Sequence, residues 1–307
     1  GSRSKGMLRP TVAFAAPLFA VAVMGYLSGY GDTLVLGAYS SLLVGTYTAS
    51  LAMARLLPIG IAALSFIFLP VAAKFHRDRD TPSIEALYVT ATKWTLLASL
   101  PFFLIFVFLP GSSLQLVYGT AYSTVVTPLQ ILVVGAFLST LVGPAAMTLI
   151  AFGRTRLLVL NSVLAGVVDV GVSFALVPGF GLTGAATAWA IATALYPVLS
   201  LVEIAIMYGI HPFRRHLLGP LLTTFVPVGV LVALLDPLPL WVLPLVGVAI
   251  ILWFIAMVIV TGSVDEGDKK LLVAIEGMLG TRLTLVRRLG ALGIRPRPSE
   301  PGPRSGE

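Results

Sequence analysis

The chain has 307 residues, of which 57% are hydrophobic and 11% are charged, and its formal net charge is +7. A soluble globular domain has about a quarter of its residues charged, so this composition excludes a water-soluble core and predicts an integral membrane protein. The sequence contains no cysteine, which excludes a disulfide framework, a thiol nucleophile and a thiolate metal site.

The first apolar run extends from Val12 to Tyr30 and follows a short basic segment. A cleavable signal peptide also begins with basic residues, but its apolar core is shorter and is followed by a cleavage site. Because comparable apolar runs follow along the chain, we interpret this run as a retained transmembrane helix. We expect Gly31-Asp32 to end it.

The second run, Leu42 to Lys74, is long enough to cross a bilayer at ~1.5 Å of rise per residue. Arg55 lies near its middle, and a cation at that depth costs about 3 kcal/mol or more, so it should face a partner or a wet cavity. Pro58 cannot donate to the carbonyl of Ala54, which predicts a kink beside Arg55. Helical spacing places a small, weakly polar set of residues on one face, which predicts the wall of a pathway. These residues are Gly45, Thr48, Ala52, Arg55, Ile59 and Ala62.

Six further apolar runs complete a predicted all-α membrane protein with eight transmembrane helices. They lie at about 83–109, 122–152, 157–177, 183–208, 217–235 and 240–260. We expect Pro101 to break the third span and Pro144 to kink the fourth. Turn residues predict an irregular link over 111–121 and a turn over 178–181.

Charge placement supports this count and predicts the orientation. The links after spans one, three, five and seven contain no Lys or Arg. The N-terminus, the other links and the C-terminus contain every Lys and Arg except Arg55 and Lys93. The positive-inside rule therefore predicts that both termini are cytoplasmic.

A basic amphipathic helix is predicted after the last span. Ser263 and Glu266 have the spacing of a capping box, and apolar residues then recur at helical spacing beside several Lys and Arg. Such a helix is typical of a segment that lies on anionic lipid, and the tail from Arg295 has a disordered composition. Nucleic-acid binding is the alternative for these charges, but no fold or aromatic platform supports it, so we expect membrane lipids as partners and no nucleic acid.

Two local patterns have weak functional interpretations. Residues 179–184 match GxGxxG, and Glu203 lies about twenty residues further on, as in a dinucleotide site. No strand or βαβ unit surrounds this motif, so we interpret it as a tight turn that lets helices pack closely, and we expect no cofactor. His76, His211 and His216 lie in basic loops without metal-ligand spacing, and nothing resembles a nucleophile with its base, so we expect neither a metal site nor an enzyme.

The cavity candidates are the polar residues inside the spans: Arg55, Asp169, Lys93 and Asn161. Asp169 forms a stripe with Asn161, Ala165 and Ser173 at spacings of four, which predicts that it faces protein or water. Arg55 and Asp169 then form either a structural ion pair or a substrate or ion site. Lys93 either snorkels to the interface or lines the pathway.

Asp32 and Glu203 lie near the ends of their spans, where interfacial solvation is the simpler interpretation.

Four landmarks reveal a family resemblance. They are GDTLVLGAYSSLLVGTYTASLAMARLLP from Gly31, LQLVYGTAYSTVVTPLQIL from Leu114, the block from Ala151 that contains GRTRLLVLNSVLAGVVDVGVSF, and TGSVDEGDKKLL from Thr261. In order and spacing, from about Pro10 to Leu289, they resemble the C-terminal lobe of oligosaccharide flippases of the multidrug/oligosaccharidyl-lipid/polysaccharide superfamily.

The resemblance implies an inverted V of two six-helix lobes, often followed by two further helices. It divides the chain into an inter-lobe linker (1–9), the six-helix C-terminal lobe (10–210), two additional helices (211–262), the amphipathic cytoplasmic helix (263–292) and a tail (293–307). No first lobe precedes residue 10, so we expect a fragment or a chain that works beside a second one. The resemblance also implies that a cation such as Arg55 contacts a lipid diphosphate.

The function expected from the resemblance is transport at the plasma membrane. The chain would be part of a flippase that moves polyprenyl-diphosphate-linked oligosaccharide to the outer leaflet for cell-surface polysaccharide assembly. One alternative is a cation-coupled exporter of the multidrug type, with Asp169 as the coupling carboxylate. Another is a membrane scaffold that transports nothing. Copurification of a polyprenyl-linked sugar would distinguish the first from the others.

Overall fold

The computed structural model describes residue 26, residues 29–122 and 125–210, residues 225, 227, 229 and 230, and residues 242–260. Within these ranges all regular structure is helical, which confirms the predicted all-α class. The predicted linker, amphipathic helix, tail and the loop at 211–216 lie outside the described residues, as do most of the first and seventh spans. Residues 242–260, in the predicted eighth span, are helical.

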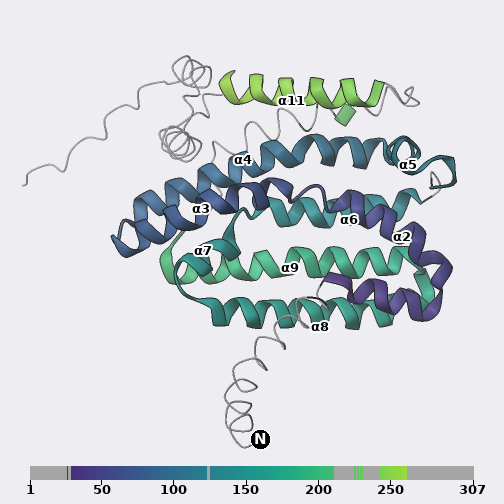
Figure 1. Cartoon of the computed structure of the whole chain (residues 1–307), viewed down its shortest axis with the longest axis horizontal. Helices are drawn as coiled ribbons and strands as arrows, with labels where there is room; N and C mark the ends of the chain where they lie inside the picture. The colour runs from purple at the N-terminus through teal and green to yellow at the C-terminus, as the bar shows by residue number, and fades with distance from the viewer. Residues whose placement is uncertain are drawn as a thin grey trace, which may run out of the picture.

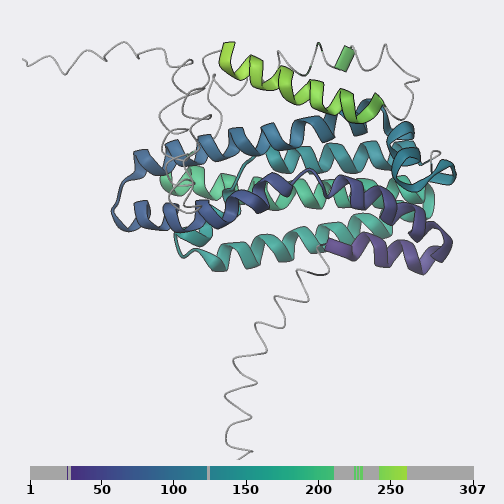
Figure 2. The ribbon, with the colours of Figure 1, turned by 45° about the horizontal axis from the view of Figure 1, so that its top comes forward.

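The described part is a bundle of long, roughly parallel helices (Figures 1 and 2). After a first helical segment at residues 29–39, the helices are α2 (Ser41–Ala54), α3 (Ile59–Arg77), α4 (Thr81–Phe108), α5 (Pro110–Tyr118), η1 (Thr120–Tyr122), α6 (Val126–Leu141), α7 (Ala145–Ala151), α8 (Thr155–Phe180), α9 (Leu182–Tyr208) and α11 (Leu243–Val260). Helix α9 packs between α8 and α6, while α4 packs against α3, α6 and α11.

Four helices of the described part are long and apolar enough to cross a membrane: α3, α4, α8 and α9. The pair α6 and α7, bent by 40° at its break, makes a fifth if it is one broken span. These helices confirm a multi-pass membrane protein. The count of eight remains a prediction, because two of its spans fall largely outside the described residues.

The basic connections gather at one end of the bundle. The α3–α4 and α7–α8 connections lie at this end, whereas α5 and the α8–α9 turn lie at the opposite end (Figures 1 and 2). Apart from Arg55 and Lys93, every Lys and Arg in the described ranges belongs to those two connections or to the adjoining helix ends. The fold therefore has the two-ended charge segregation that the sequence predicted.

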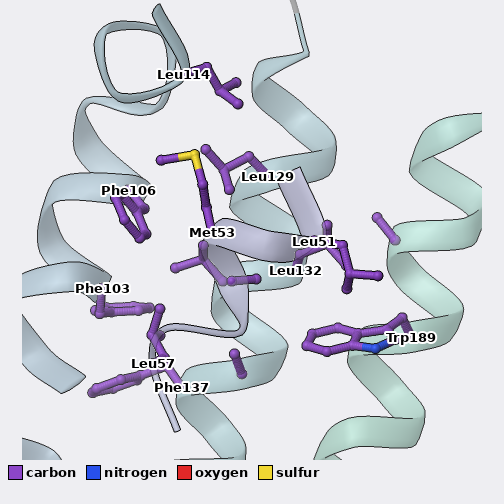
Figure 3. Packing of buried hydrophobic residues seen from close by; sticks show 14 of the residues in the cluster. Leu51, Met53, Leu57, Phe103, Phe106, Leu114, Leu129, Leu132, Phe137 and Trp189 are labelled. Carbon is purple, nitrogen blue, oxygen red and sulfur yellow. The ribbon is translucent and has the colours of Figure 1, made fainter. Parts of the chain in front are cut away.

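Helix α2 anchors the larger hydrophobic cluster. Leu51, Met53 and Leu57 insert among side chains of α4, α6 and α9, and Trp189 closes the cluster from α9 (Figure 3). The rings of Phe103 and Phe137 stack with their centroids 3.9 Å apart, which joins α4 to α6. Because the lipid outside the bundle is as apolar as these side chains, close packing of this kind stabilises the helix contacts.

The second span is broken beside Arg55, as predicted. Helix α2 ends at Ala54 and α3 begins at Ile59, with Pro58 removing one backbone donor. The Ala54 carbonyl accepts instead from the Leu57 N–H at 3.2 Å. The Leu57 carbonyl accepts from Ser99 Oγ of α4 at 2.7 Å. The carbonyls of Ala54 and Leu57 therefore find donors within the protein, as a bilayer interior requires.

The fourth span is broken at the predicted proline, and α4 supports this break too. The carbonyl of Val142 accepts from the Tyr88 hydroxyl of α4 at 2.5 Å. Gly143 has φ +72°, and a Cβ added there would collide with Thr92 Oγ1. Glycine is thus required by the left-handed backbone and by the close approach of α4.

Three local expectations are wrong. Helix α4 runs unbroken through Pro101, because neighbouring helices can hold a proline-containing span in place. The link over 111–121 is mostly helix α5, which Pro110 starts at a position where a missing N–H costs nothing. Helix α8 likewise continues through Pro178, and the chain turns only at Gly181, where φ is +54°.

Loss of the Tyr88 hydroxyl should destabilise the fold. The substitution Tyr88→Phe leaves the Val142 carbonyl without its partner, at a cost of about 1–3 kcal/mol. We expect a lower thermal unfolding midpoint in detergent for this variant. The matched control Tyr39→Phe, at a half-exposed ring, should leave the midpoint unchanged. Equal midpoints for the two variants would contradict the role assigned to Tyr88.

Impermeant thiol labelling tests the orientation. Ala121 and Thr155 are both exposed and lie at opposite ends of the bundle. In intact cells, Ala121→Cys should react with an impermeant maleimide, and Thr155→Cys should react only after the membrane is opened. The reverse pattern would overturn the assignment of the basic end to the cytoplasm.

Candidate functional site

The predicted pathway face of α2 and α3 lies on the surface of the described structure. Gly45, Thr48, Ala52, Ile59 and Ala62 are exposed, and Arg55 is half-buried among them. In a membrane this face meets lipid, water or another protein surface. A guanidinium in contact with bare lipid has a high desolvation cost, so water or another protein surface is the favoured neighbour of Arg55.

Arg55 is held at the helix break by the first helical segment. Its Nη2 donates to the Gly29 carbonyl at 2.6 Å, and its guanidinium carbon lies 4.3 Å from the centroid of the Tyr30 ring. A cation over a ring face is attracted by about 0.5–2 kcal/mol. A guanidinium has five N–H donors, and within the described residues Nη2 uses one of them for the Gly29 carbonyl.

Asp169 lies inside the bundle beside a second carboxylate, Asp32. Both side chains are fully buried. Asp169 Oδ2 accepts from the Asp32 backbone N–H at 3.1 Å, and the Tyr47 hydroxyl donates to Asp32 Oδ2. Asp169 Oδ1 and Ser173 Oγ have no hydrogen-bond partner within the described structure. The site thus combines two buried acids with unused oxygen ligands.

The interfacial interpretation of Asp32 is wrong, and the reason is local. Gly31-Asp32 does not end the first span, because residues 29–39 form one helix that carries both residues into the bundle. Gly31 permits the close approach to α8: a Cβ added there would lie 2.8 Å from Asp169 Oδ2. The spacing of Asp32 with buried Val35 and Leu36 was the sequence signal for this helical face.

The structure does not form the direct Arg55–Asp169 ion pair. Arg55 binds the carbonyl of Gly29, and Asp169 binds the N–H of Asp32. The two predicted candidates therefore meet on one short stretch of the first helical segment. That segment contacts both the half-buried Arg55 and the buried Asp169.

The predicted polar stripe of α8 does face protein. Asn161, Ala165, Asp169 and Ser173 are all buried. Asn161 Nδ2 donates to Glu203 Oε2 at 2.9 Å and lies 3.4 Å from Ser200 Oγ. Glu203 is half-buried and bound to α8, so its interfacial interpretation is incomplete. The stripe thus bonds to α9 at Asn161 and to the first helical segment at Asp169.

Lys93 is separate from this stripe. It is 8% exposed on α4, so it lies in the bundle interior and not along the lipid-facing surface. Helix α4 packs against α3, α6 and α11. Lys93 thus lies on the buried side of α4. Its role in a pathway stays a prediction.

The two weak motifs have structural roles. The GxGxxG segment is the α8–α9 turn, where a Cβ added at Gly184 would lie 2.7 Å from the Leu176 carbonyl oxygen. Close helix packing, as predicted, explains this glycine. His76 stacks on Phe152 with ring centroids 4.2 Å apart, beside Tyr208, at the basic end. His211 and His216 lie outside the described residues.

A groove of about 560 Å³ lies between α6 and α9, away from the charged residues. Its lining is apolar apart from Gln130 and Thr187. The groove contains no charged side chain, so it offers nothing that would hold an anionic headgroup.

Substitution of Gly31 tests the contact between the first helical segment and α8. The methyl of Gly31→Ala would press on Asp169 Oδ2 and on Val170, so we expect a lower thermal unfolding midpoint. Gly29→Ala is the matched control, because a Cβ at Gly29 meets no atom within 4 Å. If both alanine variants unfold alike, the close approach of this segment to Asp169 is not formed.

Comparison with known proteins identifies the first part of the chain. Residues 2–127 match a family model described as polysaccharide biosynthesis protein. This range includes Arg55 and Asp32, whereas Asp169 and Asn161 lie beyond it. No curated protein and no solved structure matches the chain. This match supports the resemblance drawn from the sequence landmarks: residues 2–127 are similar to those of a polysaccharide biosynthesis protein.

Proposed function

We propose that this chain is part of a transporter that flips lipid-linked oligosaccharide from the cytoplasmic to the outer leaflet of the plasma membrane. The observation that carries the proposal is Arg55, held half-buried at a helix break on an exposed face of small residues. The match of residues 2–127 to a polysaccharide biosynthesis protein model supports a role in polysaccharide assembly.

The depth of Arg55 suits the headgroup of a crossing lipid. Arg55 follows Ser40 by 15 residues, which is about 22 Å of helix, against a hydrocarbon core of about 30 Å. A lipid-linked sugar must carry its diphosphate across this core. A guanidinium offers planar paired donors to phosphate oxygens, and its charge offsets the anion in a site of low dielectric.

The exposed face requires a second wall. Alternating access moves two halves about a site between them, and the small side chains of this face leave room for a headgroup. We propose that a second half, from a first lobe or another chain, covers the face of Gly45, Thr48, Ala52, Ile59 and Ala62. Water in the closed cavity would lower the desolvation cost of Arg55.

Substitution of Arg55 tests the proposal in liposomes that contain the transporter with its second half. Loss of a charge-assisted hydrogen bond costs about 1.5–3 kcal/mol, so Arg55→Ala should slow flipping of a labelled polyprenyl-diphosphate sugar roughly tenfold to hundredfold. Arg55→Lys should retain part of the rate, because a point charge still attracts phosphate. The exposed Arg77, substituted by Ala, is the matched control. Wild-type flipping by Arg55→Ala, with folded yield maintained, would refute the headgroup role.

A second candidate is favoured by the buried acids. Asp32 and Asp169, with the unpartnered Ser173 hydroxyl, present oxygen ligands and negative charge for a proton or a monovalent cation. Coupling of this kind fits a sugar-lipid flippase and also a multidrug-type exporter. Efflux of cationic dyes without flipping of sugar lipid would favour the exporter.

Asp169→Asn tests ion coupling. The asparagine can still accept from the Asp32 N–H, so the fold should persist while the charge is lost. We expect transport to lose its acceleration by an imposed proton or sodium gradient and to keep its gradient-free rate. Glu203→Gln, another in-span carboxylate, is the control. An unchanged response to the gradient in Asp169→Asn would exclude this residue from coupling.

A further inference from the structure

Two tyrosines form a stack beside Arg55. The rings of Tyr26 and Tyr30 lie with centroids 4.8 Å apart and planes inclined by 28°. The guanidinium of Arg55 lies over Tyr30. Tyr26 is 67% exposed and Tyr30 is 37% exposed. The protein therefore presents an aromatic ledge, defined by Tyr26 and Tyr30, that adjoins its mid-span cation.

The ledge is unusual at this depth. Tyrosine is enriched where the membrane meets water, because its ring is apolar and its hydroxyl needs a polar partner. Tyr30 instead contacts Arg55, which lies about 22 Å of helix from the outer end at Ser40. The charge of Arg55 disfavours contact with lipid, so this side of the helix faces water or protein. The aromatic ledge adjoins Arg55 and therefore faces the same water or protein.

The chemistry of the ledge fits a sugar ring. A pyranose has flat C–H faces that pack on aromatic rings, and its rim of hydroxyls can bond to phenol hydroxyls. In a lipid-linked oligosaccharide the first sugar is bonded directly to the diphosphate. Binding of the diphosphate at Arg55 therefore places the first sugar ring, which is attached to that diphosphate, beside the side chains that adjoin Arg55.

We propose, on the basis of the proposed flipping function, that Tyr26 and Tyr30 bind the sugar residue directly attached to the lipid diphosphate. Arg55 binds the diphosphate, which every such lipid carries. The ledge contacts the first sugar ring, which differs from one such lipid to another. The ledge is thus a determinant of substrate specificity, and it adds affinity only when a sugar is present.

The experiment compares two lipids on the transporter assembled with its second half. The probes are a polyprenyl diphosphate carrying one sugar residue and the same polyprenyl diphosphate without sugar. Dissociation constants are measured in nanodiscs for wild type, Tyr26→Leu, Tyr26→Trp and Arg55→Ala. Tyr39→Leu is the matched control, because Tyr39 is an exposed tyrosine of the first helical segment at its outer end.

Tyr26→Leu should weaken binding of the sugar-bearing lipid by roughly threefold to tenfold, the value of one aromatic stacking contact, and leave the sugar-free lipid unchanged. Tyr26→Trp should retain sugar binding, Tyr39→Leu should change neither, and Arg55→Ala should weaken both. Equal losses for both lipids in Tyr26→Leu, or no loss, would overturn the ledge while leaving the flippase proposal standing. A wild type that binds neither lipid would overturn both.

Discussion

Backbone hydrogen bonding at membrane depth is the constraint on which this structure depends. A carbonyl freed inside a bilayer has no water to bind, so a broken span survives only where protein supplies a donor. Helix α4 supplies two: Ser99 to the Leu57 carbonyl and Tyr88 to the Val142 carbonyl. Helix α4 is itself continuous through Pro101, and two interrupted spans pack against it.

The first of these breaks lies beside the candidate cation. The Arg55 N–H still donates to the Leu51 carbonyl, as in a helix, and the next N–H groups donate three residues back in a tighter turn. From the end of α2, the Arg55 guanidinium reaches the first helical segment and donates to the Gly29 carbonyl. The same segment carries Asp32 to Asp169. The first helical segment thus contacts both the half-buried Arg55 and the buried Asp169.

The sequence predicted the structure correctly where a residue type restricts the backbone or the burial of its helix face. Pro58 and Pro144 predicted both breaks, and the polar stripe of α8 predicted its buried face. It misled at Gly31-Asp32, a dipeptide typical of a turn. Here Gly31 allows close helix contact, and the backbone N–H of Asp32 donates to Asp169 of α8, 137 residues away. The hydrogen bonds from Ser99 and Tyr88 could not be predicted either, because only the folded chain brings these hydroxyls to the freed carbonyls.

An experimental structure with a polyprenyl-diphosphate-linked sugar bound tests the central claim most directly. We expect diphosphate oxygens at about 2.8 Å from the Arg55 guanidinium, against the face that carries Thr48 and Ala52, with the helix interrupted between Ala54 and Ile59. A headgroup bound elsewhere, or a helix that runs unbroken from α2 into α3, would contradict it.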